Sequence, residues 1–160
     1  MKHFFPILIA AVICCCTSCS NNTIFSDERT FDNDDWRRFS KENFDVQIKD
    51  VESCYHLCFD MWIDTTRFRE QLLQLAVNME SPTGDRRMFP AYVHIREHGR
   101  WQGEMEGNLL HVKDRLRQYF FFNSKGEQHI EIEQATNRYD LYGVNRIKFH
   151  IEKAELAYPK

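Results

Sequence analysis

The chain has 160 residues, of which 42% are hydrophobic and 28% are charged, and its formal net charge is −3. This composition is typical of one globular domain and excludes a disordered or multi-domain chain. The near balance of 21 basic and 24 acidic residues argues against nucleic acid as a partner, because binding to phosphates needs an excess of basic groups. No apolar stretch approaches twenty residues, which excludes a polytopic membrane protein.

The first 18 residues predict an export signal. Lys2 and His3 precede an apolar segment over residues 4–13, which would span only about 15 Å as a helix, roughly half a bilayer core. Ser18-Cys19 is similar to the end of a bacterial lipobox, in which the cysteine carries diacylglycerol and becomes the mature N-terminus. We therefore expect residues 1–18 to be a lipoprotein signal peptide and Cys19 to be the lipid attachment site, with the acyl chains holding the protein on a membrane. The alternative is an ordinary secretory signal cut near Ser18 or Ser20.

Residues 19–35 are expected to be the lipidated N-terminus and a flexible tether. Asn, Ser, Thr, Asp and Glu predominate there, and Ile24, Phe25 and Phe31 are the only large apolar groups. The run at residues 32–35, Asp-Asn-Asp-Asp, lacks the Gly and the terminal Glu of an EF-hand loop. It is predicted to be a solvated turn.

Residues 36–160 are predicted to be the folded domain, because apolar side chains recur there with a period of two. This alternation predicts strands over residues 44–48, 53–64, 87–95, 129–133 and 144–154. Residues 73–79 also alternate, but a helix remains an alternative because Phe68, Leu72, Leu75, Ala76 and Met79 fall at helical spacing. The segment 123–126, Asn-Ser-Lys-Gly, predicts a hairpin. About seven or more short strands with frequent turns predict an all-β fold, an antiparallel β-sandwich.

Two motifs could suggest metal or disulfide chemistry. His94, Glu97 and His98 spell H-x-x-E-H, a zinc-hydrolase pattern that needs both histidines on one helical turn. On the strand expected here, residues four apart are separated by about 13 Å, too far to share one zinc ion. Cys54 and Cys58 lie along one strand and cannot bridge each other, so we expect two partly buried thiols.

The remaining side chains indicate binding more than catalysis. The chain contains no nucleophile elbow, no phosphate-binding glycine loop and no C-x-x-C pair, so we predict no enzyme, no catalytic or metal residues and no cofactor. A candidate interaction surface consists of Trp36, Trp62, Trp101, Tyr139 and Tyr142. Such rings could also stack on sugars, which makes a carbohydrate-binding β-sandwich the alternative function.

Several segments, taken in chain order, carry a family resemblance. They are Cys19; Trp36-Arg37-Arg38 before Phe44-x-Val46-x-Ile48-x-Asp50; Tyr55-His56-Leu57; Glu80-Ser81-Pro82-Thr83-Gly84; Trp101-x-Gly103; Ile132-Glu133-Gln134-Ala135; and Gly143-Val144 leading into Phe149-x-Ile151-Glu152-Lys153. Together they resemble the gliding-motility lipoprotein family GldH of the Bacteroidetes. The resemblance implies a non-catalytic envelope lipoprotein, most naturally of the outer membrane, whose partners are motility and type IX secretion proteins. It also favours a strand over residues 73–79.

Overall fold

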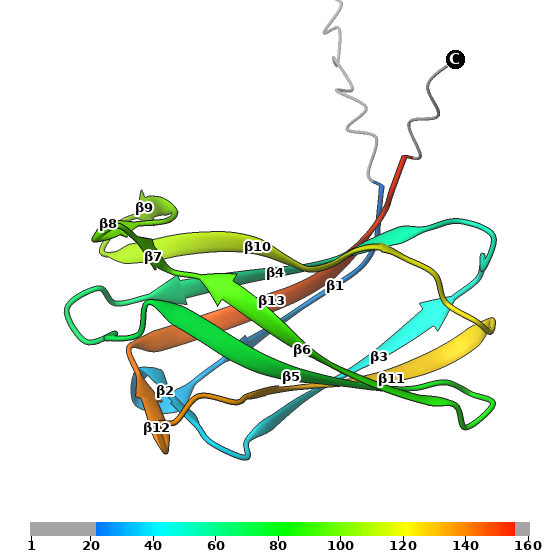
Figure 1. Cartoon of the computed structure of the whole chain (residues 1–160), viewed down its shortest axis with the longest axis horizontal. Coiled ribbons are helices and arrows are strands. Elements are labelled where there is room, and N and C mark those ends of the chain that lie inside the picture. Colours follow the sequence, from blue (N-terminus) through cyan, green and yellow to red (C-terminus); the bar gives the residue numbers. More distant parts are fainter. Residues whose placement is uncertain (1–21, 156–160) are drawn as a thin grey trace, which may run out of the picture.

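A computed structural model describes residues 22–155, which form two antiparallel sheets packed face to face (Figure 1). The strands are β1 (Thr23–Thr30), β2 (Asp35–Arg37), β3 (Lys41–Ile48), β4 (Tyr55–Ile63), β5 (Leu72–Glu80), β6 (Arg86–His94), β7 (Arg96–Glu97), β8 (Arg100–Trp101), β9 (Glu104–Glu106), β10 (Leu109–Phe120), β11 (Gly126–Gln134), β12 (Asp140–Tyr142) and β13 (Val144–Lys153). A 3-10 turn, η1 (Asp32–Asp34), precedes β2. The predicted all-β sandwich is therefore confirmed.

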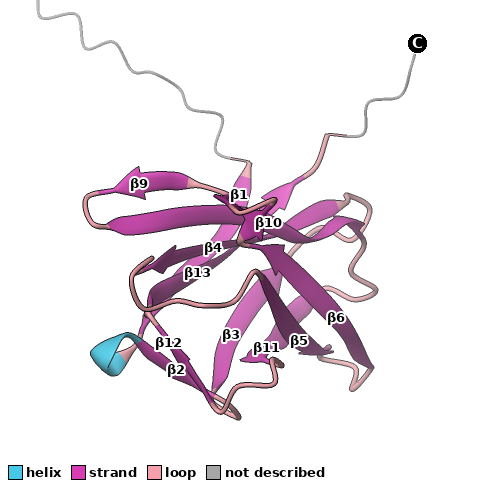
Figure 2. Ribbon diagram, turned by 60° about the vertical axis from the view of Figure 1, so that its left-hand side comes forward, coloured by secondary structure: helices cyan, strands magenta, loops and turns pink. Residues whose placement is uncertain are grey.

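One sheet has the strand order β1-β13-β4-β10-β9 and the other the order β3-β11-β5-β6. Two short ribbons, β2 with β12 (Figure 2) and β7 with β8 (Figure 1), lie at the margins of this sandwich. The core between the sheets is apolar, and Leu57, Phe59 and Met61 of β4 are fully buried in it. Among the described residues, no helix is long and apolar enough to cross a membrane.

The ambiguous segment at residues 73–79 is a strand. Leu73, Leu75 and Val77 of β5 are fully buried, while the residues between them are exposed or half-buried. β5 pairs with β6 on one side and with β11 on the other. Successive side chains of such a strand point to opposite faces of the sheet, so every second one faces the core. The strands predicted over residues 44–48, 53–64, 87–95, 129–133 and 144–154 are also confirmed, as β3, β4, β6, β11 and β13.

The predicted tether is wrong over residues 23–30, because Thr23–Thr30 forms β1 and pairs with β13 at the edge of the five-stranded sheet. Backbone pairing does not depend on apolar composition, and a single inward side chain fixes which face is buried. Phe25 supplies that side chain, with its ring centroid 6.3 Å from that of Phe44 and 6.1 Å from that of Phe149. The acidic run after β1 is a turn, as predicted, and Asp34 Oδ1 accepts a hydrogen bond from Asn145 Nδ2 at 2.8 Å.

The predicted hairpin at residues 123–126 is also wrong, because β10 and β11 belong to different sheets. The segment reverses the chain as its composition requires, but it crosses from one sheet to the other. Turn chemistry fixes a local change of direction and not the strand partner, which is set by burial. Here Phe122, just before the turn, is buried against Tyr55 with ring centroids 5.5 Å apart.

Gly143 gives a test of this fold. It has φ +89°, and a Cβ atom there would lie 2.8 Å from the backbone nitrogen of Phe68. Gly84 has a similar φ of +84° but open space around it, so Gly84→Ala measures backbone strain alone. We expect Gly143→Ala to lower the free energy of unfolding by about 2 kcal/mol more than Gly84→Ala, because clash adds to strain. Urea unfolding measures both values, and equal losses would contradict the close approach of these segments.

Candidate functional site

The five aromatic residues predicted as one interaction surface lie in three separate places. Trp36 is fully buried, with its ring centroid 5.2 Å from that of Phe31, and closes the sandwich beneath the β2–β12 ribbon. Trp62 is also buried, on the outer side of β4. Trp101 is half-buried on β8, with the Arg96 guanidinium 3.6 Å from its ring centroid. The predicted single platform is therefore wrong.

Tyr139 and Tyr142 are the two members that stay exposed, at 69% and 53%. Tyr139 precedes β12 and Tyr142 is its last residue. Phe39 is 69% exposed and follows Arg38, whose backbone nitrogen donates to the backbone oxygen of Tyr139 at 2.7 Å. We call Phe39, Tyr139 and Tyr142 the aromatic end of the sandwich. With Trp36 and Trp62 buried, the flat stacking surface that carried the carbohydrate-binding alternative is not formed.

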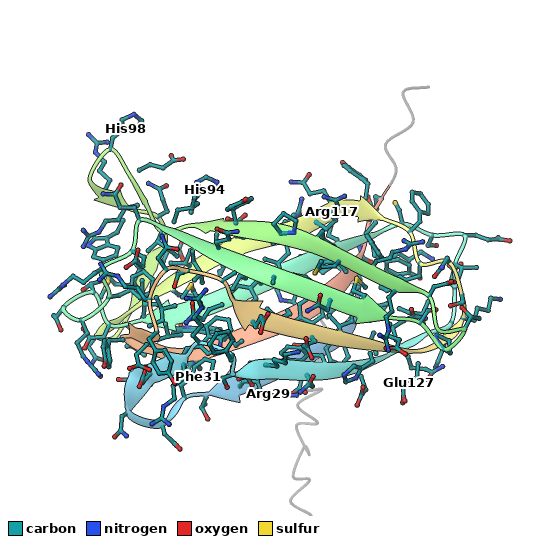
Figure 3. The ribbon with its side chains drawn as sticks, turned by 60° about the horizontal axis from the view of Figure 1, so that its bottom comes forward. Arg29, Phe31, His94, His98, Arg117 and Glu127 are labelled. Carbon is teal, nitrogen blue, oxygen red and sulfur yellow. The ribbon has the colours of Figure 1, made fainter. Side chains whose placement is uncertain are left out.

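The three side chains of the H-x-x-E-H motif do not lie together as a set of possible metal ligands. His94 ends β6, Glu97 belongs to β7, and His98 lies in the turn after β7 with φ +48°. Figure 3 shows His98 at the tip of the hairpin formed by β7 and β8, and His94 on the sheet away from that tip. The sequence-based reading of these residues as strand and turn, and not as helix, is confirmed. Cys54 and Cys58 are buried and unbonded to each other, also as expected.

The richest cluster of polar side chains lies on the outer face of the five-stranded sheet. β4 is its central strand, and all nine of its residues are buried, including His56, Cys58, Asp60 and Trp62, which point away from the core. Side chains of the flanking strands cover them. We call the following set the outer polar face: His56, Cys58, Asp60 and Trp62 of β4; His111, Lys113 and Arg115 of β10; and Arg146, Lys148, His150 and Glu152 of β13.

Trp62 lies between a histidine and an arginine from its two neighbouring strands. The His111 ring stacks on it with centroids 4.0 Å apart and 15° between planes, and the Arg146 guanidinium lies 4.2 Å from the indole centroid. A cation over an indole contributes about 0.5–2 kcal/mol, more when it is shielded from water. This stack explains why a tryptophan on the outer face is buried without being part of the core.

Glu106 of β9 fixes this stack. One carboxylate oxygen accepts from Trp62 Nε1 at 2.8 Å and the other lies 2.6 Å from His111 Nδ1. His111 Nε2 in turn lies 3.2 Å from Asp60 Oδ2, so both ring nitrogens of this histidine have carboxylate partners. The hydrogen bond from Trp62, followed by that from His111, lowers the pKa of Glu106. The arrangement holds the β9 edge strand against the centre of the sheet.

A second cluster lies further along the same face. Cys58, His150 and Glu152 each direct one potential ligand atom to a common region, and these atoms all lie within 4.8 Å of one another. Burial, followed by the charge of Glu152, raises the pKa of Cys58 to about 11, so the group is a thiol. Burial also lowers the pKa of His150. Within residues 22–155 this is the one group of such side chains close enough to share an ion.

Sequence reasoning missed both clusters. The alternation in residues 53–64 does separate His56, Cys58, Asp60 and Trp62 from the core residues of the strand. What it lacks is the identity of the neighbours, because β10 and β13 lie about 50 and 90 residues further along the chain. Only strand order and register bring His111 and His150 to opposite sides of β4.

The linked contacts of Glu106 generate a pH-dependent prediction. Its pKa is lower in the folded protein than the ordinary value of about 4.3, so its contribution to stability is complete above that value and is lost as the pH falls below it. Glu106→Gln should therefore lower the urea midpoint at pH 7, and its difference from the wild type should shrink below about pH 4.3. Glu104→Gln, an exposed change on the same strand, is the matched control. A Glu106→Gln difference that stays constant with pH would contradict this role.

Comparison with known proteins identifies a family. The family model of the GldH lipoprotein matches residues 23–151. A crystal structure of a carbohydrate-binding module specific for non-crystalline cellulose aligns with 81% of this chain and 75% of its own, at 15% identity and a TM-score of 0.44, a likeness too low to carry an argument. No curated protein matches the chain significantly. Because the matched region spans nearly all of the folded domain, the chain belongs to the GldH lipoprotein family.

Proposed function

We propose that this protein is a non-catalytic lipoprotein of the outer membrane, anchored through acyl chains on Cys19, that serves gliding-motility or type IX secretion machinery as a protein-interaction module. Membership of a lipoprotein family supports the envelope anchor. Cys19 lies outside the described residues, and its lipobox-like context supports its role as the attachment site.

The observation that carries this proposal is the position of the aromatic end relative to the start of the domain. Only residues 20–22 separate Cys19 from β1, and the backbone oxygen of Asn22 already accepts from Lys153 at 2.8 Å. Four residue steps span at most about 14 Å, so an acyl chain on Cys19 would hold the domain close to the bilayer. β1 then runs roughly 25 Å away from that point before it leads to β2 (Figure 1).

The aromatic end therefore lies at the far end of β1 from the proposed anchor. Its Phe39, Tyr139 and Tyr142 are exposed, and Arg37 and Arg38 directly precede Phe39 in the sequence. Aromatic and arginine side chains contribute most of the binding free energy at protein interfaces. A membrane-held domain that presents such a surface away from the bilayer suits a docking role.

The contacts of the outer polar face support a role without catalysis. His111, which could act as a general base, has carboxylate partners at both ring nitrogens. Cys58 is a buried thiol with a raised pKa, whereas a nucleophilic cysteine needs a lowered one. These side chains stabilise the packing of strands and are not arranged as a nucleophile with its base.

The anchor is tested by metabolic labelling with a palmitate analogue. Cys19→Ala should abolish the label and move the protein out of the membrane fraction, because the acyl chains supply the attachment. Cys16→Ala, which changes a neighbouring thiol of the signal segment, should remain labelled and membrane-bound. A Cys19→Ala protein that keeps its label would overturn the assignment.

The docking surface is tested by chemical crosslinking in intact cells, followed by identification of the captured proteins. A triple change of Phe39, Tyr139 and Tyr142 to Ala should reduce recovery of motility or secretion components about tenfold or more. The reason is that the loss of each aromatic ring from an interface weakens the free energy of binding by about 1 kcal/mol or more. Tyr92→Ala, an exposed aromatic change on β6, is the control and should leave recovery unchanged. Equal recovery from the triple variant and the wild type would exclude this surface.

A further inference from the structure

The Cys58 cluster is formed by residues from two neighbouring strands. Cys58 lies on β4, and His150 lies directly opposite it on β13. Glu152 follows two residues later on β13, so it extends from the same face of the sheet as His150. The ligand atoms of the three side chains lie within 4.8 Å of one another.

The chemistry of these three side chains indicates a particular class of ion. They offer one sulfur, one imidazole nitrogen and one carboxylate oxygen, which is a donor set that zinc accepts. In a tetrahedral zinc site such ligands lie roughly 3.3–3.8 Å apart, so a shift of about 1 Å by side-chain rotation would close this one. Ca²⁺ and Mg²⁺ require sets of oxygen ligands and are not suited to it.

The hydrogen bonding of His150 differs from that of His111 on the same face. His150 Nε2 lies 3.4 Å from Glu152 Oε1, while His150 Nδ1 is buried and has no hydrogen-bond partner among the described residues. A buried polar atom without a partner is destabilising, and such atoms are uncommon in folded proteins. On the same face, His111 has a carboxylate partner at each ring nitrogen. The two histidines therefore differ, and His150 is the one with an unpaired nitrogen.

The cluster can be reached from solvent. It borders a surface hollow of about 410 Å³ whose other lining residues are Asp60, Lys113, Asp114, Arg115 and Lys148. The charged residues that line the hollow are three acidic ones, Asp60, Asp114 and Glu152, and three basic ones, Lys113, Arg115 and Lys148. Their formal charges cancel, so the hollow has no net positive charge that would repel a cation. Arg115, which pairs with Cys58 from the neighbouring strand β10, is exposed to solvent.

We propose that Cys58, His150 and Glu152 form a zinc-binding site on the outer polar face. The three protein ligands leave the fourth position directed to the hollow, as in zinc sites that keep an exchangeable position for water or for a side chain of another molecule. Binding replaces the thiol proton of Cys58, and the released proton passes to solvent. The site is independent of the aromatic end and of the anchor proposed above.

Zinc binding to the full-length chain in detergent tests the proposal. Cys14, Cys15, Cys16 and Cys19 are changed to Ser in every sample, so that Cys54 and Cys58 are the remaining thiols. Competition with a chromophoric chelator should give one Zn²⁺ per chain, and Co²⁺ should show the charge-transfer absorption of a thiolate ligand. Cys58→Ser and His150→Gln should each weaken zinc binding about tenfold or more. Cys54→Ser, the matched control, should bind as the parent does.

Two further measurements separate loss of a ligand from loss of the fold. Circular dichroism and urea unfolding establish whether each variant is folded, and Glu152→Gln provides a third ligand change if one of the others is not. Zinc should raise the thermal midpoint of the parent and of Cys54→Ser but not that of Cys58→Ser, because only a folded site gains from the ligand. A parent chain without stoichiometric zinc overturns the proposal. So does zinc that remains bound with parental affinity in Cys58→Ser and His150→Gln, because it would then lie at surface histidines.

Discussion

The central position of β4 is the constraint on which the rest of this structure depends. β4 pairs along its whole length with β10 on one side and with β13 on the other, so its backbone hydrogen bonds are made within the sheet. Its odd-numbered residues fill the core between the two sheets. Its even-numbered residues are polar or amphipathic and are buried as well, which means that their partners must come from the neighbouring strands.

That requirement organises the outer polar face. A polar group taken out of water is tolerated when another group completes its hydrogen bonds. Asp60 and Glu106 complete those of His111, and Glu106 also holds the indole nitrogen of Trp62. His150 lacks the equivalent second partner in the described part of the chain, which singles it out on a face where its counterpart is fully bonded.

The edges and ends of the sandwich carry the features through which the molecule can meet its surroundings. β1, the edge strand that follows the lipobox-like segment, joins the domain to the proposed membrane anchor through very few residues. The β2–β12 ribbon lies at the other end of β1. There the Trp36 side chain is buried in the core, whereas Tyr139 and Tyr142 are exposed to solvent. One short ribbon thus separates aromatic side chains used for packing from those free to contact another protein.

The amino-acid sequence by itself determined the all-β class, the position of most long strands and the family, because each of these depends on local alternation or on short segments in a fixed order. It also identified the even-numbered side chains of β4 as a second face, and it argued correctly that H-x-x-E-H would not be helical. It could not determine that Thr23–Thr30 joins the sheet, because an edge strand needs little apolar surface once its backbone is paired. Only the tertiary structure decided that Trp36 and Trp62 are buried, that residues 123–126 cross between sheets, and that His111 and His150 flank β4. The physical reason is that strand order and register are set by contacts between residues far apart in the chain, and no local pattern encodes them.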